Sequence, residues 1–395
     1  MEKLGLSNGK TTFGHIEFSF GLPDAKLAVI NEGEMGFETN YEEILSRIDR
    51  VDPVAYGRTR NFIDGAVTKL SPYISRGVIS TRQVFRAVME RGFDPGKIGK
   101  FIQELAWRDY WQQVWIANGS EINQDLRREQ PNICHYKMPR ALVEASTGIN
   151  AIDEALHEFH ETGYLHNHVR MYVAAIACNV GGSHWRVPAR WMYYHLLDGD
   201  WASNALSWQW VSGANAGKKY YANQENINKY CRTHQKGTFL DVDYGSFEKA
   251  EIPEILRERT VPRLETPLPE KRSIEIDPEL PTLIYNFYNL DPKWHEEANF
   301  NRVLLMEPSV YKAYPISKNS MEFTLGLSEN IKGIQCYVGE FDELVEAYGI
   351  REAIFKEHPL NQYNGREEPR DWMFEVTGYY RSFFAFWKKC ERELK

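Results

Sequence analysis

The chain has 395 residues, of which 43% are hydrophobic and 26% are charged, so it is long enough for two or three globular domains of roughly 100–200 residues each. Its 47 basic and 55 acidic side chains give a net charge of −8. No apolar run approaches the roughly 18 residues that a membrane-spanning helix needs. These values argue against a single small module and against a membrane protein.

The charge is unevenly distributed along the chain. Residues 1–240 are almost neutral, and the acidic excess lies in residues 241–395, so the first part is the better candidate for binding a polyanion. The five cysteines are widely spread with no C-x-x-C pair, and we expect neither a disulfide framework nor a metal site. The N-terminal residues lack a basic segment that leads into an apolar one, which predicts no secretory signal and a cytoplasmic location.

Residues 41–240 have the pattern of successive helices joined by short polar segments. Ser80, followed three residues later by Gln83, predicts a capping box at a helix start. A long helix is expected over 97–118, and another over 163–180 that ends at a glycine pair. We therefore predict an N-terminal extension and an all-helical domain, with boundaries at 1–40 and 41–245.

Tryptophan is concentrated in this helical part. Large aromatic side chains fill protein cores, but clustered indoles also suit base stacking, flavin packing or electron transfer. Eight of the 11 tryptophans fall within it: Trp107, Trp111, Trp115, Trp185, Trp191, Trp201, Trp208 and Trp210.

The pattern changes after a proline-rich segment, which we expect to be an extended connector over 246–281. Short β-rich runs then alternate with helix-like segments, which predicts a small parallel α/β domain over 282–395. The β-rich runs are 282–288, 302–308 and 333–339, and the helical segments are 321–330, 342–348 and 374–394. The predicted fold class is thus an all-helical domain followed by a small parallel α/β domain.

Four blocks in the helical part carry candidate chemistry: TKLSPYISRGVIS (68–80), ELAWRDYW (104–111), TGYLHNHVRM (162–171) and LLDGDWASNALSWQW (196–210). Thr68 and Ser71 precede a helix start, where hydroxyls and free backbone N–H groups suit a phosphate. Arg170 on an apolar helix face needs a counter-charge, and Asp198 is a natural partner. Helix capping would also explain the hydroxyls and the aspartates.

In this order and spacing, and with the WQW tripeptide, the four blocks resemble the flavin-binding helical domain of the photolyase/cryptochrome family. The resemblance covers about residues 45–240. It implies a folded FAD, bound noncovalently in the helical domain, and no metal. The cofactor-binding residues that it implies are Tyr56, Thr68, Lys69, Leu70, Ser71, Arg108, Arg170, Asp198, Asp200 and Asn204.

The resemblance also implies a pocket for UV-damaged DNA, into which a pyrimidine dimer is flipped out of the helix. The implied activity is that of a deoxyribodipyrimidine photolyase-like lyase, which repairs the dimer by electron transfer from photoexcited reduced FAD. The alternative is a cryptochrome-type blue-light receptor without repair activity, favoured by His168 where repair enzymes usually have arginine. The implied catalytic pocket consists of Glu104, Trp107, Asn167, Met171 and Trp210.

Trp208 and Trp185 match the first two members of the family's electron-transfer chain. Tyr136 is the aromatic residue nearest the expected place of the third, although another indole could substitute for it. In the family an α/β domain normally precedes the helical domain, whereas here an α/β-like region follows it. This region is either a permuted counterpart or an unrelated appendage. No motif indicates an antenna chromophore or names a signalling partner.

Overall fold

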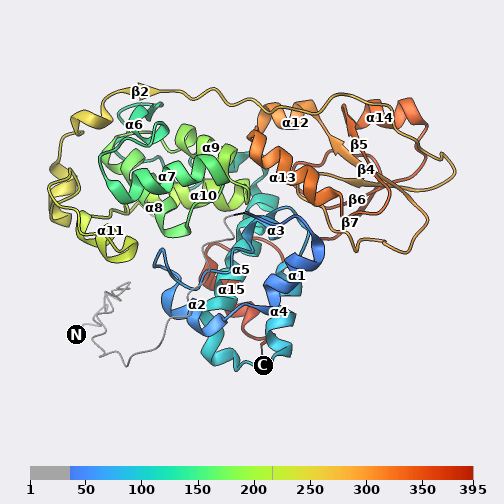
Figure 1. Cartoon of the computed structure of the whole chain (residues 1–395), viewed down its shortest axis with the longest axis horizontal. Helices are drawn as coiled ribbons and strands as arrows, with labels where there is room; N and C mark the ends of the chain where they lie inside the picture. The colour runs from blue at the N-terminus through green and yellow to red at the C-terminus, as the bar shows by residue number, and fades with distance from the viewer. Residues whose placement is uncertain (1–35, 216, 395) are drawn as a thin grey trace, which may run out of the picture. The chain divides into compact units, whose positions relative to one another are not determined.

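The computed structural model describes residues 36–215 and 217–394, and the part from Glu38 to Lys395 forms one compact unit. Most of the predicted N-terminal extension, residues 1–40, therefore lies outside the described residues. The helical part contains α1 (Tyr41–Asp49), α2 (Pro53–Thr59), α3 (Ser71–Ser75), α4 (Thr81–Glu90), α5 (Pro95–Asn118), α6 (Arg140–Val143), α7 (Asn150–Thr162), α8 (Asn167–Ala175), α9 (Arg186–His195), α10 (Trp201–Ser212) and α11 (Gln224–Cys231) (Figure 1).

Local signals place several of these helix ends. The Ser80 hydroxyl accepts a hydrogen bond from the backbone N–H of Gln83 at 3.0 Å, which confirms the predicted cap of α4. The predicted helix over 163–180 is different in the structure. Gly163, with φ of 70°, ends α7, and α8 begins only at Asn167. After Ala175 the chain winds as a wider π-helical turn over Ile176–Val180.

The second part is a five-stranded sheet in which every neighbouring pair is parallel. Its strands are β3 (Thr282–Tyr285), β4 (Asn301–Met306), β5 (Ile334–Val338), β6 (Ala353–Lys356) and β7 (Arg366–Glu368), in the order β5-β4-β3-β6-β7. The helices α12 (Pro308–Ala313), α13 (Lys318–Ser328) and α14 (Phe341–Tyr348) connect them. The predicted fold class is confirmed. The sequence had indicated the first three strands, but not β6 and β7.

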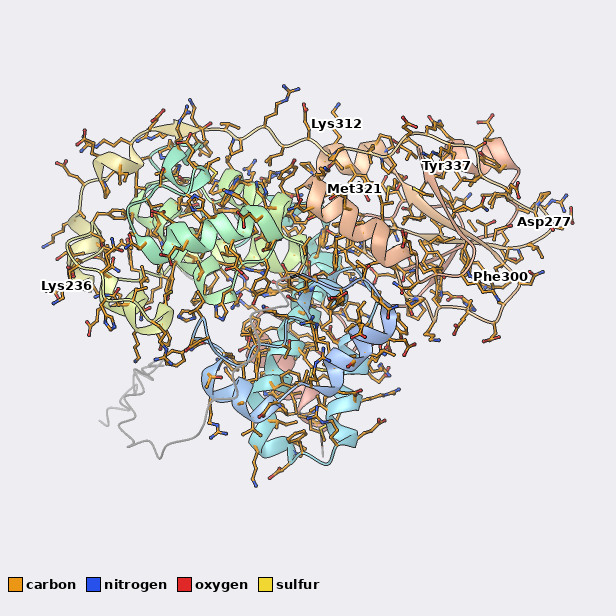
Figure 2. The ribbon with its side chains drawn as sticks, in the orientation of Figure 1. Lys236, Asp277, Phe300, Lys312, Met321 and Tyr337 are labelled. Carbon is orange, nitrogen blue, oxygen red and sulfur yellow. The ribbon has the colours of Figure 1, made fainter. Side chains whose placement is uncertain are left out.

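The α/β part has an apolar core around its sheet. This core includes Tyr337 on β5, and Met321 on α13 is also buried; both residues are labelled in Figure 2. The connector between the parts, residues 246–281, is hydrogen-bonded to the helical part through a short two-stranded sheet. In this sheet β1 (Met138–Pro139) pairs antiparallel with β2 (Arg259–Thr260).

The end of the chain returns to the helical part. The predicted helix over 374–394 is only Phe383–Cys390 (α15), which contacts α5 (Figure 1). The segment before it is not helical because its backbone N–H groups bond to α5 side chains instead. Those of Met373 and Gly378 donate to Asp109 and Gln113, each at 2.9 Å. No helix in the described ranges is long and apolar enough to cross a membrane.

Candidate functional site

Two arginine–aspartate pairs form the polar centre of the helical part. Arg170 on α8 donates to Asp198 at 3.0 Å, and Arg108 on α5 lies 3.3 Å from Asp200. Both aspartates are buried, with 6% and 4% of their surface exposed. They flank Gly199 in the turn that leads into α10, where Asp200 caps the helix by accepting from the backbone N–H of Ser203. The capping role and the ion pairs therefore coexist.

The charges in this centre are fixed by their surroundings. Burial by itself would raise the pKa of Asp198, but the charges of Arg170 and Arg108, with hydrogen bonds from Ser71 and Arg170, outweigh it and hold the pKa below its usual value. Asp200 accepts from Gln112 on α5 at 2.7 Å. Asp198 is thus an ionised acceptor inside the protein.

The first block lies beside this centre. Ser75 accepts from Arg108 at 2.6 Å and donates to the backbone carbonyl of Asp198 at 2.9 Å. Lys69 adopts a left-handed backbone conformation with φ of 51°, and its ammonium lies 5.4 Å from the ring centre of Tyr164. The Thr68 hydroxyl accepts from the backbone N–H of Leu70, a buried residue.

Two further predicted cofactor residues are positioned by neighbouring helices. The Tyr56 ring packs edge-on against Phe101 at 5.3 Å, and burial, then the nearby Glu104 carboxylate, raise its pKa. The Asn204 amide donates to the backbone carbonyl of Ala189 on α9 at 2.8 Å. Each side chain is therefore held in one orientation by a neighbouring helix.

The donor and acceptor types in this centre fit FAD. Carboxylates accept from the N–H and hydroxyl groups of a flavin and its ribityl chain, and arginine, lysine and hydroxyl groups donate to diphosphate oxygens. Asp198 is ionised and accepts from Ser71, and Arg108 supplies positive charge beside the hydroxyl of Ser75. The residues present can bind the diphosphate and the polar groups of a flavin dinucleotide.

A cavity of about 530 Å³ lies where the helical and α/β parts meet. It is lined by α4, by the segments after β3 and β6, and by Arg370 near the end of the chain. From the predicted cofactor set, its lining among the described residues includes Arg108 and Asp200. The polar centre therefore extends to the seam between the two parts.

The residues predicted for the damaged-base pocket have different environments. Glu104 forms an ion pair with Arg60 at 3.3 Å, a partner that sequence reasoning missed. Asn167 is exposed at the start of α8, and Met171 is half-buried one turn later. Trp210 is 43% exposed and lies 5.7 Å from the Tyr220 ring.

Trp107 differs from the other predicted pocket residues because the end of the chain covers it. Its ring stacks on Phe383 of α15, with centroids 3.8 Å apart and planes at 9°. One face of this indole is therefore occupied by the protein itself. Nothing in the local sequence around Trp107 indicated this contact, since Phe383 is 276 residues away in the chain.

Two of the three predicted electron-transfer residues, Trp185 and Tyr136, share a neighbour that the sequence did not single out, His184. Trp208 is buried on α10 and Trp185 is fully buried before α9. The Trp185 indole donates to Asp125 at 2.7 Å, and its ring lies 5.7 Å from that of His184. The Tyr136 ring, which is 65% exposed, stacks on the His184 ring with centroids 5.0 Å apart.

Comparison with known proteins identifies the helical part. A family model described as the FAD binding domain of DNA photolyase matches residues 101–267. A deoxyribodipyrimidine photo-lyase of Streptomyces griseus is 31% identical over 154 residues, which are 38% of this chain and 32% of that protein. Another, from Thermus thermophilus, is 33% identical over 165 residues, covering 40% of this chain and 38% of that one.

A cryptochrome DASH of Danio rerio is 30% identical over 210 residues, 51% of this chain and 38% of that protein. Among solved structures, a cryptochrome of Synechocystis sp. aligns with a TM-score of 0.44 and 26% identity over 49% of this chain and 44% of that one. The chain spans about a third of the length of these curated relatives. The helical part therefore carries an FAD-binding domain that is similar to those of photolyases and cryptochromes.

Proposed function

We propose that this flavoprotein repairs UV-induced pyrimidine dimers in DNA with light. FAD, when bound, reduced and excited, supplies one electron for opening the dimer. The chain's own residues bind this cofactor and present the lesion to it. In this proposal Lys69, Ser71 and Arg108 hold the phosphate and ribityl region, and Asp198 and Asp200 accept from polar groups of the flavin.

The observation that carries the proposal is the position of Glu104. It lies one helical turn before Arg108 on α5, so a carboxylate stands at the rim of the candidate FAD site. Its side chain is 31% exposed and within reach of a ligand, although Arg60 holds it in the free protein. A pyrimidine that offers an N–H group can replace this arginine as the donor to Glu104.

An arginine and several aromatic rings support DNA as the substrate. The guanidinium of Arg232 forms an exposed ion pair with Asp64 at 3.3 Å and lies 4.2 Å from the ring centre of Phe62, which in turn lies 5.1 Å from Tyr230. The His168 ring is 4.6 Å from Tyr230. Cations attract the phosphate backbone, and rings of this kind stack with bases that have left the duplex.

A cryptochrome-type blue-light receptor is the second candidate. It is favoured by the stacking of Phe383 on Trp107. DNA repair would need the Trp107 indole to contact a flipped base, and here a side chain from the end of the chain covers it. In a receptor, the same contact would connect the flavin domain to the C-terminal segment.

Repair of a defined oligonucleotide separates the two candidates. The FAD-loaded, chemically reduced full-length protein is incubated with single-stranded and double-stranded oligonucleotides that carry one pyrimidine dimer, in blue light and in the dark. Restored pyrimidines are then measured by chromatography. We expect light-dependent restoration, at least in the single strand, where no base pairs need to break. FAD-loaded protein that restores no dimer in either strand would refute repair and leave the receptor.

A further inference from the structure

Arg76 is a fully buried arginine directly after α3, at the seam between the helical and α/β parts. Its Nη2 donates to the carbonyl oxygen of Gly199, the residue between Asp198 and Asp200. The preceding residue, Ser75, donates to the carbonyl oxygen of Asp198 at 2.9 Å. Two consecutive side chains therefore hold the backbone of the turn that carries both aspartates.

The other side of Arg76 faces the α/β part. Its guanidinium carbon lies 3.3 Å from the ring centre of Phe287 and 5.2 Å from that of Tyr288, in the segment after β3. The backbone N–H of Leu290 donates to the Arg76 carbonyl at 2.9 Å. A Cβ atom at Gly77 would overlap the carbonyl oxygen of Tyr288. The two parts are thus packed backbone to backbone around this one guanidinium.

The charge of Arg76 has no ionic partner. In the described part of the chain no carboxylate lies within ion-pair distance of it, and its Nε and Nη1 groups have no hydrogen-bond partner. Burial lowers its pKa. A buried cation without a carboxylate is costly, and here two aromatic faces and one carbonyl oxygen are what stabilise it. Close packing of apolar groups does not by itself account for a charged side chain at this buried position.

We propose that Arg76 is a positioning residue of the FAD site, through which the α/β part holds the Asp198–Asp200 turn in its flavin-binding geometry. The inference rests on the assignment of these two aspartates to FAD. Arg76 does not pair with either carboxylate and acts through the Gly199 carbonyl. Without it the turn is free to move, and the carboxylates no longer meet Arg170 and Arg108 in register. FAD affinity then depends on contacts such as Phe287, which lie outside the helical part.

The test measures FAD affinity and stability separately in the full-length protein. Apo-protein is titrated with FAD while flavin fluorescence is followed, and thermal unfolding of the same apo-protein is recorded. Arg76→Met keeps an unbranched apolar stem without the guanidinium donors, and Phe287→Leu removes the ring from the α/β side while the arginine stays. Arg140→Met, at an exposed arginine on α6 outside the cavity lining, is the matched control, and Asp198→Asn tests the site itself.

We expect Arg76→Met to weaken FAD binding about tenfold or more, Phe287→Leu to weaken it by a smaller factor, and Arg140→Met to leave it unchanged. Arg76→Lys should restore affinity only in part, because an ammonium is not planar and cannot stack on Phe287 while it donates to Gly199. Bound flavin in the weakened variants should also lose the fine structure of its absorption band. If Arg76→Met does not fold, Phe287→Leu decides the question.

Lower unfolding temperatures with unchanged FAD affinity in Arg76→Met and Phe287→Leu would overturn the proposal and make the contact purely structural. Wild-type FAD affinity in Asp198→Asn would overturn it in another way, because the turn would then not belong to the FAD site. Reduced FAD affinity in Arg76→Met, Phe287→Leu and Asp198→Asn, with unchanged affinity in the Arg140→Met control, supports the proposal. None of these outcomes depends on repair activity, so they are independent of the test of DNA repair.

Discussion

Replacing Arg170 by methionine should destabilise the protein, because it leaves the buried Asp198 carboxylate without its closest cation. The two side chains are 20% and 5% exposed, and their charged atoms lie 3.0 Å apart. Removing one partner of a buried pair costs about 3–5 kcal/mol. Arg108 still lies near Asp198 and compensates in part, so we expect a loss of about 3 kcal/mol. This is a large fraction of the roughly 5–15 kcal/mol that stabilises a folded protein.

The loss has a defined pH dependence. In the wild type the pKa of Asp198 is lowered, so the pair stabilises the protein above the unfolded-state pKa of about 4 and its contribution disappears as the pH falls through the folded-state pKa. In the variant, burial still raises the pKa of Asp198 and the largest opposing charge, that of Arg170, is gone, so we expect this pKa to lie above the wild-type value and above that of the unfolded chain. The folded variant then binds a proton more tightly than the unfolded chain, and its stability falls as the pH rises above about 4. The two proteins should differ least in acid and most at pH 7.

The free energy of unfolding is measured with urea on apo-protein at several pH values, with tryptophan fluorescence as the signal. The control is Arg140→Met. Arg140 is 45% exposed and forms ion pairs with Glu258 at 2.7 Å and Glu144 at 3.5 Å, and its loss should cost less than about 1 kcal/mol. A loss below about 1 kcal/mol for Arg170→Met at pH 7, or a loss that increases in acid, would show that the Arg170–Asp198 pair does not stabilise the protein in this way.

Three further predictions concern single side chains. Burial raises the pKa of Asp109 to about 6, so the wild type should lose up to about 3 kcal/mol of stability as the pH rises from about 4 to 6. Asp109→Asn should flatten this part of a curve of unfolding temperature against pH, and an unchanged curve would contradict the assignment. Glu104→Ala should lower the number of dimers repaired per absorbed photon about tenfold or more while FAD stays bound; wild-type yield with a lower unfolding temperature would make Glu104 a structural residue. Trp208→Phe should greatly slow the bleaching of flavin absorbance by light and an external reductant, whereas Trp191→Phe, a buried indole packed on Phe159, should not; equal rates in both variants would exclude Trp208 from the path.

The C-terminal segment covers part of the pocket that the sequence predicted for a damaged base. The sequence pattern put Glu104 and Trp107 on one face of α5, as their spacing of three residues suggests. In the structure Glu104 pairs with Arg60, while Trp107 stacks on Phe383. Helical periodicity states which side chains share a face, but it carries no information on which distant segment covers that face.

Local patterns were sufficient for much of the fold. The Ser80 cap, the long helix that became α5 and the strands β3, β4 and β5 follow from interactions among residues a few positions apart, such as caps and hydrophobic periodicity. Predictions based on such patterns were wrong or incomplete where long-range contacts compete. The helix expected over 374–394 is shortened to Phe383–Cys390 because Asp109 and Gln113 bind the backbone before it.

In the candidate FAD site, too, some contacts follow from local sequence patterns and others depend on long-range packing. Motif order and spacing along the sequence identified the FAD-binding family and suggested the pairing of Arg170 with Asp198, since an arginine on an apolar helix face needs a counter-charge. The contacts of Arg76 with the Gly199 carbonyl, between the two aspartates, and with the Phe287 ring from the other part of the chain became visible only in the folded molecule. The stacking of a buried guanidinium on a ring more than 200 residues away depends on how the helical and α/β parts pack, and no pattern of neighbouring residues encodes that packing.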